Sequence, residues 1–266
     1  SVLSSLNVTG GATAALASGT ITIDQTAADT STVATTLGIA GSGVIGAIDG
    51  TQADVYTTVN IAASSALTIA DVNLAAATSV SASGAGVTTI SALTDVGAVT
   101  SFTSTGGGLV LGAAIGNAVA FTGGAGADGV VVGATTKAIA LGAGDDEATV
   151  TAVLGAGGSV AGGDGSDTLV INVAAATFSD AAAQPRISGF EKLELGTAAT
   201  GSYNGAGFTG GYSLTGALTG NSTITNAVAN STVTIGVTTG KTLDVVYADA
   251  TGTADVANLV LSSAAA

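Results

Sequence analysis

The octapeptide ATSVSASG at residues 77–84 recurs 22 residues later as VTSFTSTG at residues 99–106. Further copies of this pattern, in which an apolar residue and several small residues lead into glycine, follow towards residue 160. Their apolar positions are Val80, Phe102, Phe121, Ile139 and Val160, separated by steps of 22, 19, 18 and 21 residues. Steps of this length are typical of one coil of a parallel β-solenoid, in which each coil places its inward apolar residue on that of the coil before. A single coil buries too little surface to be stable, whereas a stack of coils forms a continuous core.

The composition favours strands along the whole chain. Hydrophobic residues make up 47% of the 266 residues, and there are 41 glycines but only one proline. Threonine and valine favour strands, and frequent glycine weakens helices. Residues 19–24 and 231–235 alternate polar and apolar side chains, which is the period of a half-buried strand. We therefore expect an all-β chain that forms a parallel β-solenoid of the β-helix or β-roll type.

The charged residues exclude several classes of chemistry. The chain has 18 acidic and 4 basic residues, a net charge of −14, and neither histidine nor cysteine. It can form no Ser-His-Asp or Cys-His catalytic system and no zinc site of the usual nitrogen and sulfur ligands. Four basic residues cannot neutralise a phosphate backbone, so we expect no nucleic-acid partner. Apolar residues come in short runs, so we expect no transmembrane segment.

Three nine-residue segments follow the pattern G-G-x-G-x-D-x-U-x, in which U is apolar. Residues 123–131 (GGAGADGVV) and 162–170 (GGDGSDTLV) fit at every fixed position, and residues 141–149 (LGAGDDEAT) fit except that Leu141 replaces the first glycine. The glycines allow a sharp turn that directs carbonyl oxygens inward, and the aspartate supplies a carboxylate. The apolar residue begins the strand that enters the core.

The aspartates of the three segments lie one coil apart. Asp146 follows Asp128 by 18 residues, and Asp167 follows Asp146 by 21 residues. All three loops should therefore stack along one edge of the solenoid, and the opposite edge, which lacks the pattern, should hold no metal. Asp145 and Asp164 add negative charge to the same edge. Without a cation the stacked loops would repel one another, and the hard cations that prefer oxygen ligands are the natural counterions.

The nonapeptides resemble the calcium-binding repeats of RTX (repeats-in-toxin) proteins, which Gram-negative bacteria export by type I secretion. This resemblance implies Ca²⁺ between successive loops, bound by carboxylate and carbonyl oxygens from both sides. Such extracellular sites have dissociation constants of about 10⁻⁴–10⁻³ M. The candidate metal-binding residues are Gly124, Gly126, Asp128, Gly142, Gly144, Asp145, Asp146, Gly163, Asp164, Gly165 and Asp167.

The wider sequence resembles bacterial surface-layer (S-layer) proteins. Repeats rich in Thr, Ala, Gly and Val, free of Met and Cys, surround the RTX-like loops and the segment ISGFEKLEL at residues 187–195. The resemblance implies a secreted structural protein, not an enzyme, that Ca²⁺ folds and joins into a sheet or filament on the bacterial cell surface. Its partners would be copies of itself, with a cell-surface glycan as anchor.

The chain divides into three regions on this interpretation. Residues 1–64 form an N-terminal β-rich segment, residues 65–195 the solenoid with the calcium-binding loops, and residues 196–266 a C-terminal β-rich segment. The stretch at residues 185–195, which holds the only proline and two of the four basic residues, closes one stack and opens the next.

Two other functions stay open at this stage. A calcium-dependent RTX adhesin, or an ice- or glycan-binding extracellular module, is suggested by Thr-x-Thr at residues 20–22, 223–225 and 232–234, although an ice-binding face needs one pair in every coil. A solenoid enzyme such as a polysaccharide lyase would need carboxylates with Lys or Arg along a groove, whereas the basic residues are scattered singly. The string GSGVIG at residues 41–46 matches a dinucleotide-binding fingerprint, but no helical pattern follows it.

Overall fold

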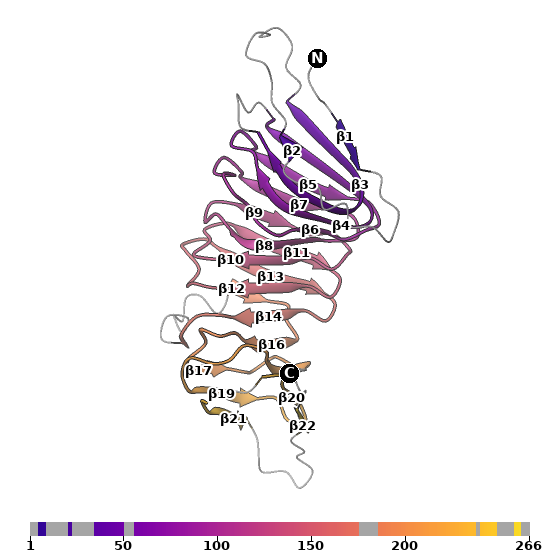
Figure 1. Cartoon of the computed structure of the whole chain (residues 1–266). Coiled ribbons are helices and arrows are strands. Elements are labelled where there is room, and N and C mark those ends of the chain that lie inside the picture. The colour runs from indigo at the N-terminus through magenta and orange to yellow at the C-terminus, as the bar shows by residue number, and fades with distance from the viewer. Residues whose placement is uncertain are drawn as a thin grey trace.

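The strands of this chain stack into one elongated coil (Figure 1). The structure, a computed structural model, describes residues 5–8, 21–22, 35–50, 56–175, 186–237, 240–248 and 258–261. The elements that lie wholly within these ranges are β-strands, and the strand pairs are parallel, so the predicted parallel β-solenoid is confirmed. The described ranges contain no helix that could cross a membrane.

The N-terminal and central strands are β1 (Ser5–Val8), β2 (Ile21–Thr22), β3 (Thr36–Asp49), β4 (Thr58–Asn73), β5 (Ser79–Ser83), β6 (Thr88–Ile90), β7 (Ser101–Ser104), β8 (Leu109–Ile115), β9 (Ala120–Thr122), β10 (Gly129–Val132) and β11 (Ala138–Ala143). The later strands are β12 (Glu147–Val150), β13 (Ser159–Asp164), β14 (Thr168–Ile171), β15 (Ile187–Ser188), β16 (Lys192–Leu195), β17 (Gly201–Asn204), β18 (Gly211–Leu214), β19 (Ser222–Ala227), β20 (Thr232–Ile235), β21 (Leu243–Tyr247) and β22 (Asn258–Leu261).

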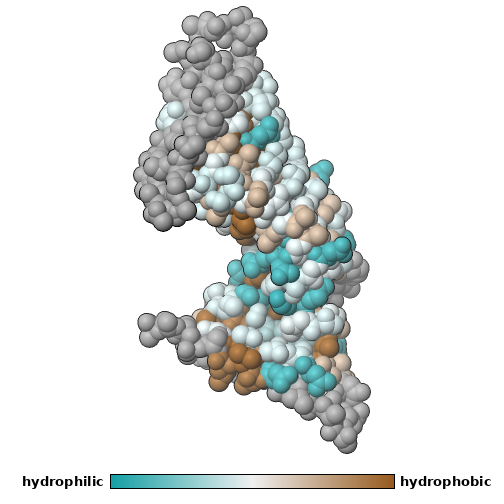
Figure 2. All heavy atoms as spheres, turned by 90° about the vertical axis from the view of Figure 1, so that its right-hand side faces the viewer, coloured by the Kyte–Doolittle hydropathy of each residue, from teal (hydrophilic) through white to brown (hydrophobic). Residues whose placement is uncertain are grey.

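The surface is made largely of small residues. Figure 2 shows one face on which most atoms are pale, with hydrophilic residues gathered across its middle and hydrophobic residues near its lower end. The most exposed large apolar side chains belong to the last strands: Val246 on β21 is 52% exposed, and Leu259 and Leu261 on β22 are 59% and 72% exposed. The last coil therefore presents apolar surface that the earlier coils bury.

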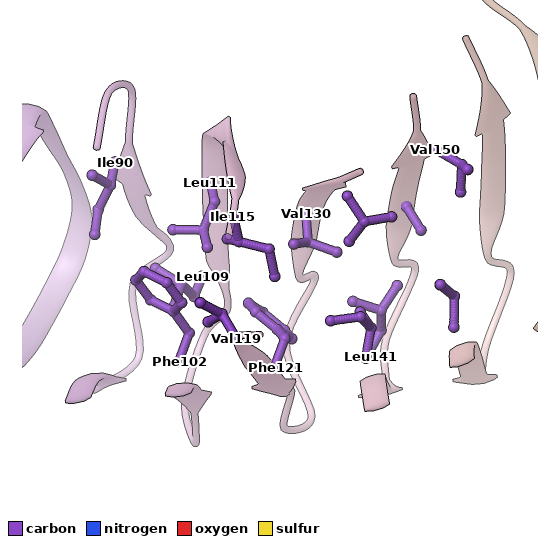
Figure 3. Close-up of a cluster of buried hydrophobic side chains, with 14 of the residues drawn as sticks. Ile90, Phe102, Leu109, Leu111, Ile115, Val119, Phe121, Val130, Leu141 and Val150 are labelled. Atoms are coloured by element: carbon purple, nitrogen blue, oxygen red, sulfur yellow. The ribbon is translucent and has the colours of Figure 1, made fainter. Parts of the chain in front are cut away.

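One face of the coil is formed by β5, β7, β9, β11 and β13. Within it, Val80 pairs with Phe102, Phe102 with Phe121, Phe121 with Ile139, and Ile139 with Val160. These are the five positions that the sequence pattern aligned, so the predicted length and phase of each coil are confirmed. All five side chains are fully buried, and Figure 3 shows Phe102 and Phe121 side by side in the interior.

The opposite face carries a second apolar column. Val132, Val150, Ile171, Leu195 and Leu214 are successive register partners on β10, β12, β14, β16 and β18, and all are buried. Alternation along each strand directs these side chains inward and their neighbours outward. The two columns together form one core along the stack, which is the burial that a single coil lacks.

The ends of the stack differ from its middle. The long strand β4 pairs with β5 through residues 58–62 and with β6 through residues 67–69, so one continuous strand contributes to both faces of the coil. Beyond β16 a separate three-stranded sheet of β17, β19 and β21 accompanies β18 and β20. The proposed region boundaries stay predictions: β4 crosses the one at 64/65, and β16 pairs with β18 across the one at 195/196. Residues 41–46 lie inside β3, which continues as a strand to Asp49, so no helix begins directly after them.

Candidate functional site

The three nonapeptide loops stack in register along one edge of the solenoid. Gly142 is the register partner of Gly163, and Glu147 is that of both Gly129 and Thr168. The loops at residues 123–128, 141–146 and 162–167 therefore follow one another at the spacing of parallel strands, about 4.8 Å. The predicted stacking of these loops is what the structure shows.

The sixth residue of each loop forms a ladder of carboxylates inside the stack. Asp128, Asp146 and Asp167 are buried, with at most 2% of each residue exposed. An Oδ1 atom of Asp128 accepts the backbone N–H of Leu109 at 2.6 Å, that of Asp146 accepts the N–H of Asp128 at 2.7 Å, and that of Asp167 accepts the N–H of Asp146 at 2.9 Å. Within a sheet, a backbone N–H normally donates to a carbonyl oxygen of the neighbouring strand. At this corner the aspartate carboxylate accepts that hydrogen bond instead, from the backbone N–H of the residue one coil earlier.

The ladder has a fourth member that the nonapeptide pattern misses. Glu191 follows Asp167 by 24 residues, and its Oε2 accepts the backbone N–H of Asp167 at 2.9 Å. The register of β14 with β16, which pairs Thr168 with Lys192, places Glu191 directly after Asp167 in the same column. The signal in the sequence was an acidic residue one coil beyond Asp167, just before an apolar strand.

The second oxygens of these aspartates differ in their partners. Oδ2 of Asp128 accepts the N–H of Gly124 in its own loop at 3.0 Å. Oδ2 of Asp146 and Oδ2 of Asp167 are buried and have no hydrogen-bond partner within the described part of the chain. Burying a carboxylate oxygen without a hydrogen-bond donor costs free energy. A bound proton or cation would remove this cost at the two oxygens.

The loop interiors bring carbonyl oxygens towards these carboxylates. A Cβ atom on Gly123 would lie 1.7 Å from the carbonyl oxygen of Leu141 and 2.6 Å from Oδ2 of Asp128, so those two oxygens are at most about 4.3 Å apart. One Ca²⁺ with bonds of about 2.3–2.6 Å can bridge such a pair. No three acidic side chains converge on one point in the described ranges, so a cation here would need backbone carbonyl ligands as well. The residues present fit Ca²⁺ on these terms.

The loop glycines are required by the close approach of the coils. Gly142, Gly144, Gly163 and Gly165 have positive φ angles of 106°, 132°, 124° and 142°, which L side chains rarely adopt. Gly126 has an ordinary φ, but its Cβ would lie 2.2 Å from the carbonyl carbon of Gly107. Likewise, a Cβ on Gly124 would lie 2.9 Å from the carbonyl oxygen of Ser104. Leu141 breaks the pattern because its side chain is fully buried in the core.

The two remaining acidic candidates lie outside the ladder. Asp145 and Asp164 are exposed. Oδ1 of Asp145 accepts the N–H of Ser166 in the next loop at 3.0 Å, and the carbonyl oxygen of Asp164 accepts the N–H of Gly144 at 2.9 Å. They tie neighbouring loops together at the surface, whereas the three buried aspartates face the loop interior.

Burial raises the pKa of two ladder carboxyls, those of Asp146 and Asp167. The pKa of Asp146 rises from 3.8 to about 6, mainly through burial, with the negative charges of Asp128 and Asp167 adding to the rise and a backbone hydrogen bond opposing it. The pKa of Asp167 is also raised, first by burial and then by the charge of Glu191. Both groups thus bind protons more tightly in the folded chain than in the unfolded chain.

This shift predicts an unusual pH dependence of stability in calcium-free buffer. Between about pH 4 and pH 6 the folded chain holds more protons than the unfolded chain, so the free energy of unfolding should fall as the pH rises through this window. The fall should be about 1–3 kcal/mol and should level off above pH 6. Urea unfolding at fixed pH values measures it, and a stability that increases from pH 4 to pH 6 would contradict the raised pKa of Asp146.

The fold and this edge define an all-β parallel β-solenoid with a buried carboxylate ladder along one corner. The chain matches no protein-family model, and comparison with curated proteins finds no match. A function for this chain is therefore inferred from the residues of the ladder and its loops.

Proposed function

We propose that this chain is a structural, self-assembling cell-surface protein, the subunit of an S-layer lattice or filament, whose solenoid is folded and stiffened by Ca²⁺. The observation that carries the proposal is the pair of buried carboxylate oxygens, on Asp146 and Asp167, that have no hydrogen-bond donor in the described residues. On this proposal Ca²⁺ lies between successive loops and neutralises the negative charge of these carboxylates. The sequence resemblance supports a secreted location at the bacterial surface.

Calcium would act on the fold through the stacking of the loops. The ladder brings three buried carboxylates into one column, each held to the coil before it. Their mutual repulsion opposes stacking, and the glycine-rich loops lose much backbone entropy when they become ordered. A cation bound only by the folded loops adds its binding free energy to folding. The solenoid would therefore be loose in calcium-poor surroundings and rigid in millimolar calcium.

Self-assembly is supported by the last described coil. Strand β22 pairs with β20 on one side, and its other edge has no partner in the described ranges. Its side chains Leu259, Val260 and Leu261 are 45–72% exposed. An unpaired, apolar strand edge is a template for pairing with another chain. A second copy of this chain is the occupant we propose, and small side chains elsewhere on the surface lose little entropy in packing.

No observation favours the other candidate functions. Of the three Thr-x-Thr pairs, those at residues 223–225 and 232–234 lie on β19 and β20, which belong to different sheets, and Thr20 lies outside the described residues. The two described pairs therefore form no common flat face of the kind an ice-binding module needs. The guanidinium of Arg186 binds the carbonyl oxygens of Leu154, Gly155 and Gly158, so it supports a turn.

Assembly should depend on calcium. Electron micrographs of the purified chain should show ordered arrays or filaments in millimolar Ca²⁺, and a chelator should disperse them. Circular dichroism of the same samples should show more strand structure with Ca²⁺ than without. The variant Asp146→Ala should show a much weaker response in both measurements, because it lacks the central ladder carboxylate. A chain that stays monomeric at every calcium concentration would refute the lattice proposal.

A further inference from the structure

The structure assigns a third inter-loop cation site, between the loop at residues 162–167 and the turn at residues 188–191. The nonapeptides predict two such sites, one between each pair of successive loops. The third site lies beyond them, and its ligands are Oδ2 of Asp167, the carbonyl oxygen of Gly189 and the carboxylate of Glu191. This inference rests on the proposed function, since it extends the calcium-bound stack by one coil.

The turn at residues 188–191 stacks on the third loop as that loop stacks on the second. Val160 pairs with Ile187 and Ala161 with Ser188, so Gly189 follows in register with Gly162. The N–H of Gly163 donates to the carbonyl oxygen of Gly189 at 3.3 Å. The turn thus occupies the place of a fourth nonapeptide loop, although its sequence does not fit the pattern.

The gap between this loop and this turn holds an unpartnered buried oxygen. Asp167 is fully buried, and no donor in the described part of the chain reaches its Oδ2. A Cβ on Gly162 would lie 1.9 Å from the carbonyl oxygen of Gly189 and 2.6 Å from Oδ2 of Asp167, so these oxygens are at most about 4.5 Å apart. Both are acceptors, and Ca²⁺ bonded to each at about 2.3–2.6 Å would join them. The same arrangement pairs Oδ2 of Asp128 with the carbonyl oxygen of Leu141 in the first loops.

Glu191 supplies the second carboxylate. Its Oε2 accepts the N–H of Asp167 at 2.9 Å, which holds its head group beside the backbone of the third loop. Among the negative charges that raise the pKa of the Asp167 carboxyl, that of Glu191 has the largest effect. Two carboxylates and a carbonyl oxygen around one gap are a ligand set that Ca²⁺ prefers, and solvent molecules can complete its coordination. A glutamate at this position, where the nonapeptides have aspartate, reaches the gap from a turn that contains only one glycine.

The test counts bound calcium in the full chain by equilibrium dialysis with radiolabelled Ca²⁺. The wild type should bind three ions. Glu191→Gln keeps an oxygen that accepts the N–H of Asp167 but removes the charge, so one of the three sites should weaken at least tenfold while two remain. The matched control is Glu194→Gln, three residues further along the chain, on β16. Glu194 contacts the hydroxyls of Ser213 and Thr215 and lies outside the ladder, so this variant should bind three ions like the wild type.

The outcomes separate this inference from the proposal on which it rests. If the wild type binds two ions and Glu191→Gln does not change them, the third site is refuted while the calcium-bound loops stand. If the wild type binds no calcium, both are refuted. A crystal grown in Ca²⁺ gives an independent reading should Glu191→Gln fail to fold. An ion within about 2.6 Å of both Asp167 Oδ2 and the Gly189 oxygen supports the site, and a direct hydrogen bond between them, from a protonated Asp167, overturns it.

Discussion

Replacing Gly163 by alanine should destabilise the solenoid by about 2–5 kcal/mol. Gly163 has a φ of 124°, and a Cβ there would lie 1.9 Å from the carbonyl oxygen and 2.8 Å from the carbonyl carbon of Gly142 in the coil before. The positive φ alone costs about 1–2 kcal/mol for an L side chain. The clash is with backbone, which cannot turn aside, so the two loops must separate at a further cost of about 1–3 kcal/mol. Urea unfolding in calcium-containing buffer measures the loss.

Gly207→Ala is the matched control for this substitution. Gly207 is also exposed and has a φ of 95°, but a Cβ there would meet no atom within 4 Å. This variant should therefore lose only the conformational part, about 1–2 kcal/mol. Equal losses in the two variants would mean that the tight approach of the loops at Gly163 contributes nothing to stability. If Gly163→Ala loses more stability than Gly207→Ala and also binds calcium more weakly, the close approach of the two loops contributes to the calcium site.

The register of the coils could be predicted because it depends on side chains that the sequence shows directly. An inward apolar residue recurs once per coil, and a shift by one residue would turn it to the surface. The step from Ile139 to Val160 is three residues longer than the one before it, yet the register holds. The extra residues lie between β12 and β13, in a turn on the surface, where an insertion leaves the strands undisturbed.

The ladder itself could be predicted only in part. The motif identified Asp128, Asp146 and Asp167, but their hydrogen bonds to N–H groups one coil earlier depend on the stagger of the coils in space. Glu191 was not predicted as a ladder residue, because it follows Asp167 by 24 residues, a longer step than the others, and its turn lacks the glycines of the motif. The separate sheet of β17, β19 and β21 was likewise not predicted, because the residues of a short strand, such as LDVVY on β21, do not show which sheet it joins.

Replacing Asp146 by asparagine should have opposite effects without and with calcium. At pH 7 without calcium the variant should be about 1–3 kcal/mol more stable than the wild type, because it removes a buried charge whose pKa is raised to about 6. The amide oxygen can still accept the N–H of Asp128, so the ladder is kept. The fall in stability between pH 4 and pH 6 should shrink as well. Thermal and urea unfolding at several pH values measure both effects.

With calcium the order of stability should reverse. A cation at a hundred times its dissociation constant stabilises the folded state by about 2.7 kcal/mol per site. The loop of Asp146 borders both sites that the nonapeptides predict, so its carboxylate contributes to each, and Asp146→Asn should lose most of this gain. Asp145→Asn, which removes an exposed charge from the neighbouring residue, should leave the calcium-free stability within about 0.5 kcal/mol of the wild type.

Truncation at the same position separates the charge from the hydrogen bond. Asp146→Ala removes the acceptor and leaves the N–H of Asp128 unpaired inside the stack, which costs about 1–3 kcal/mol. It should therefore be less stable than Asp146→Asn without calcium, although both lack the carboxylate. If asparagine and alanine were equally destabilising at pH 7, the carboxylate of Asp146 would not be a buried, uncompensated charge. If asparagine kept the full response to calcium, Asp146 would not be a ligand, and the ladder would be an architectural feature of the corner alone.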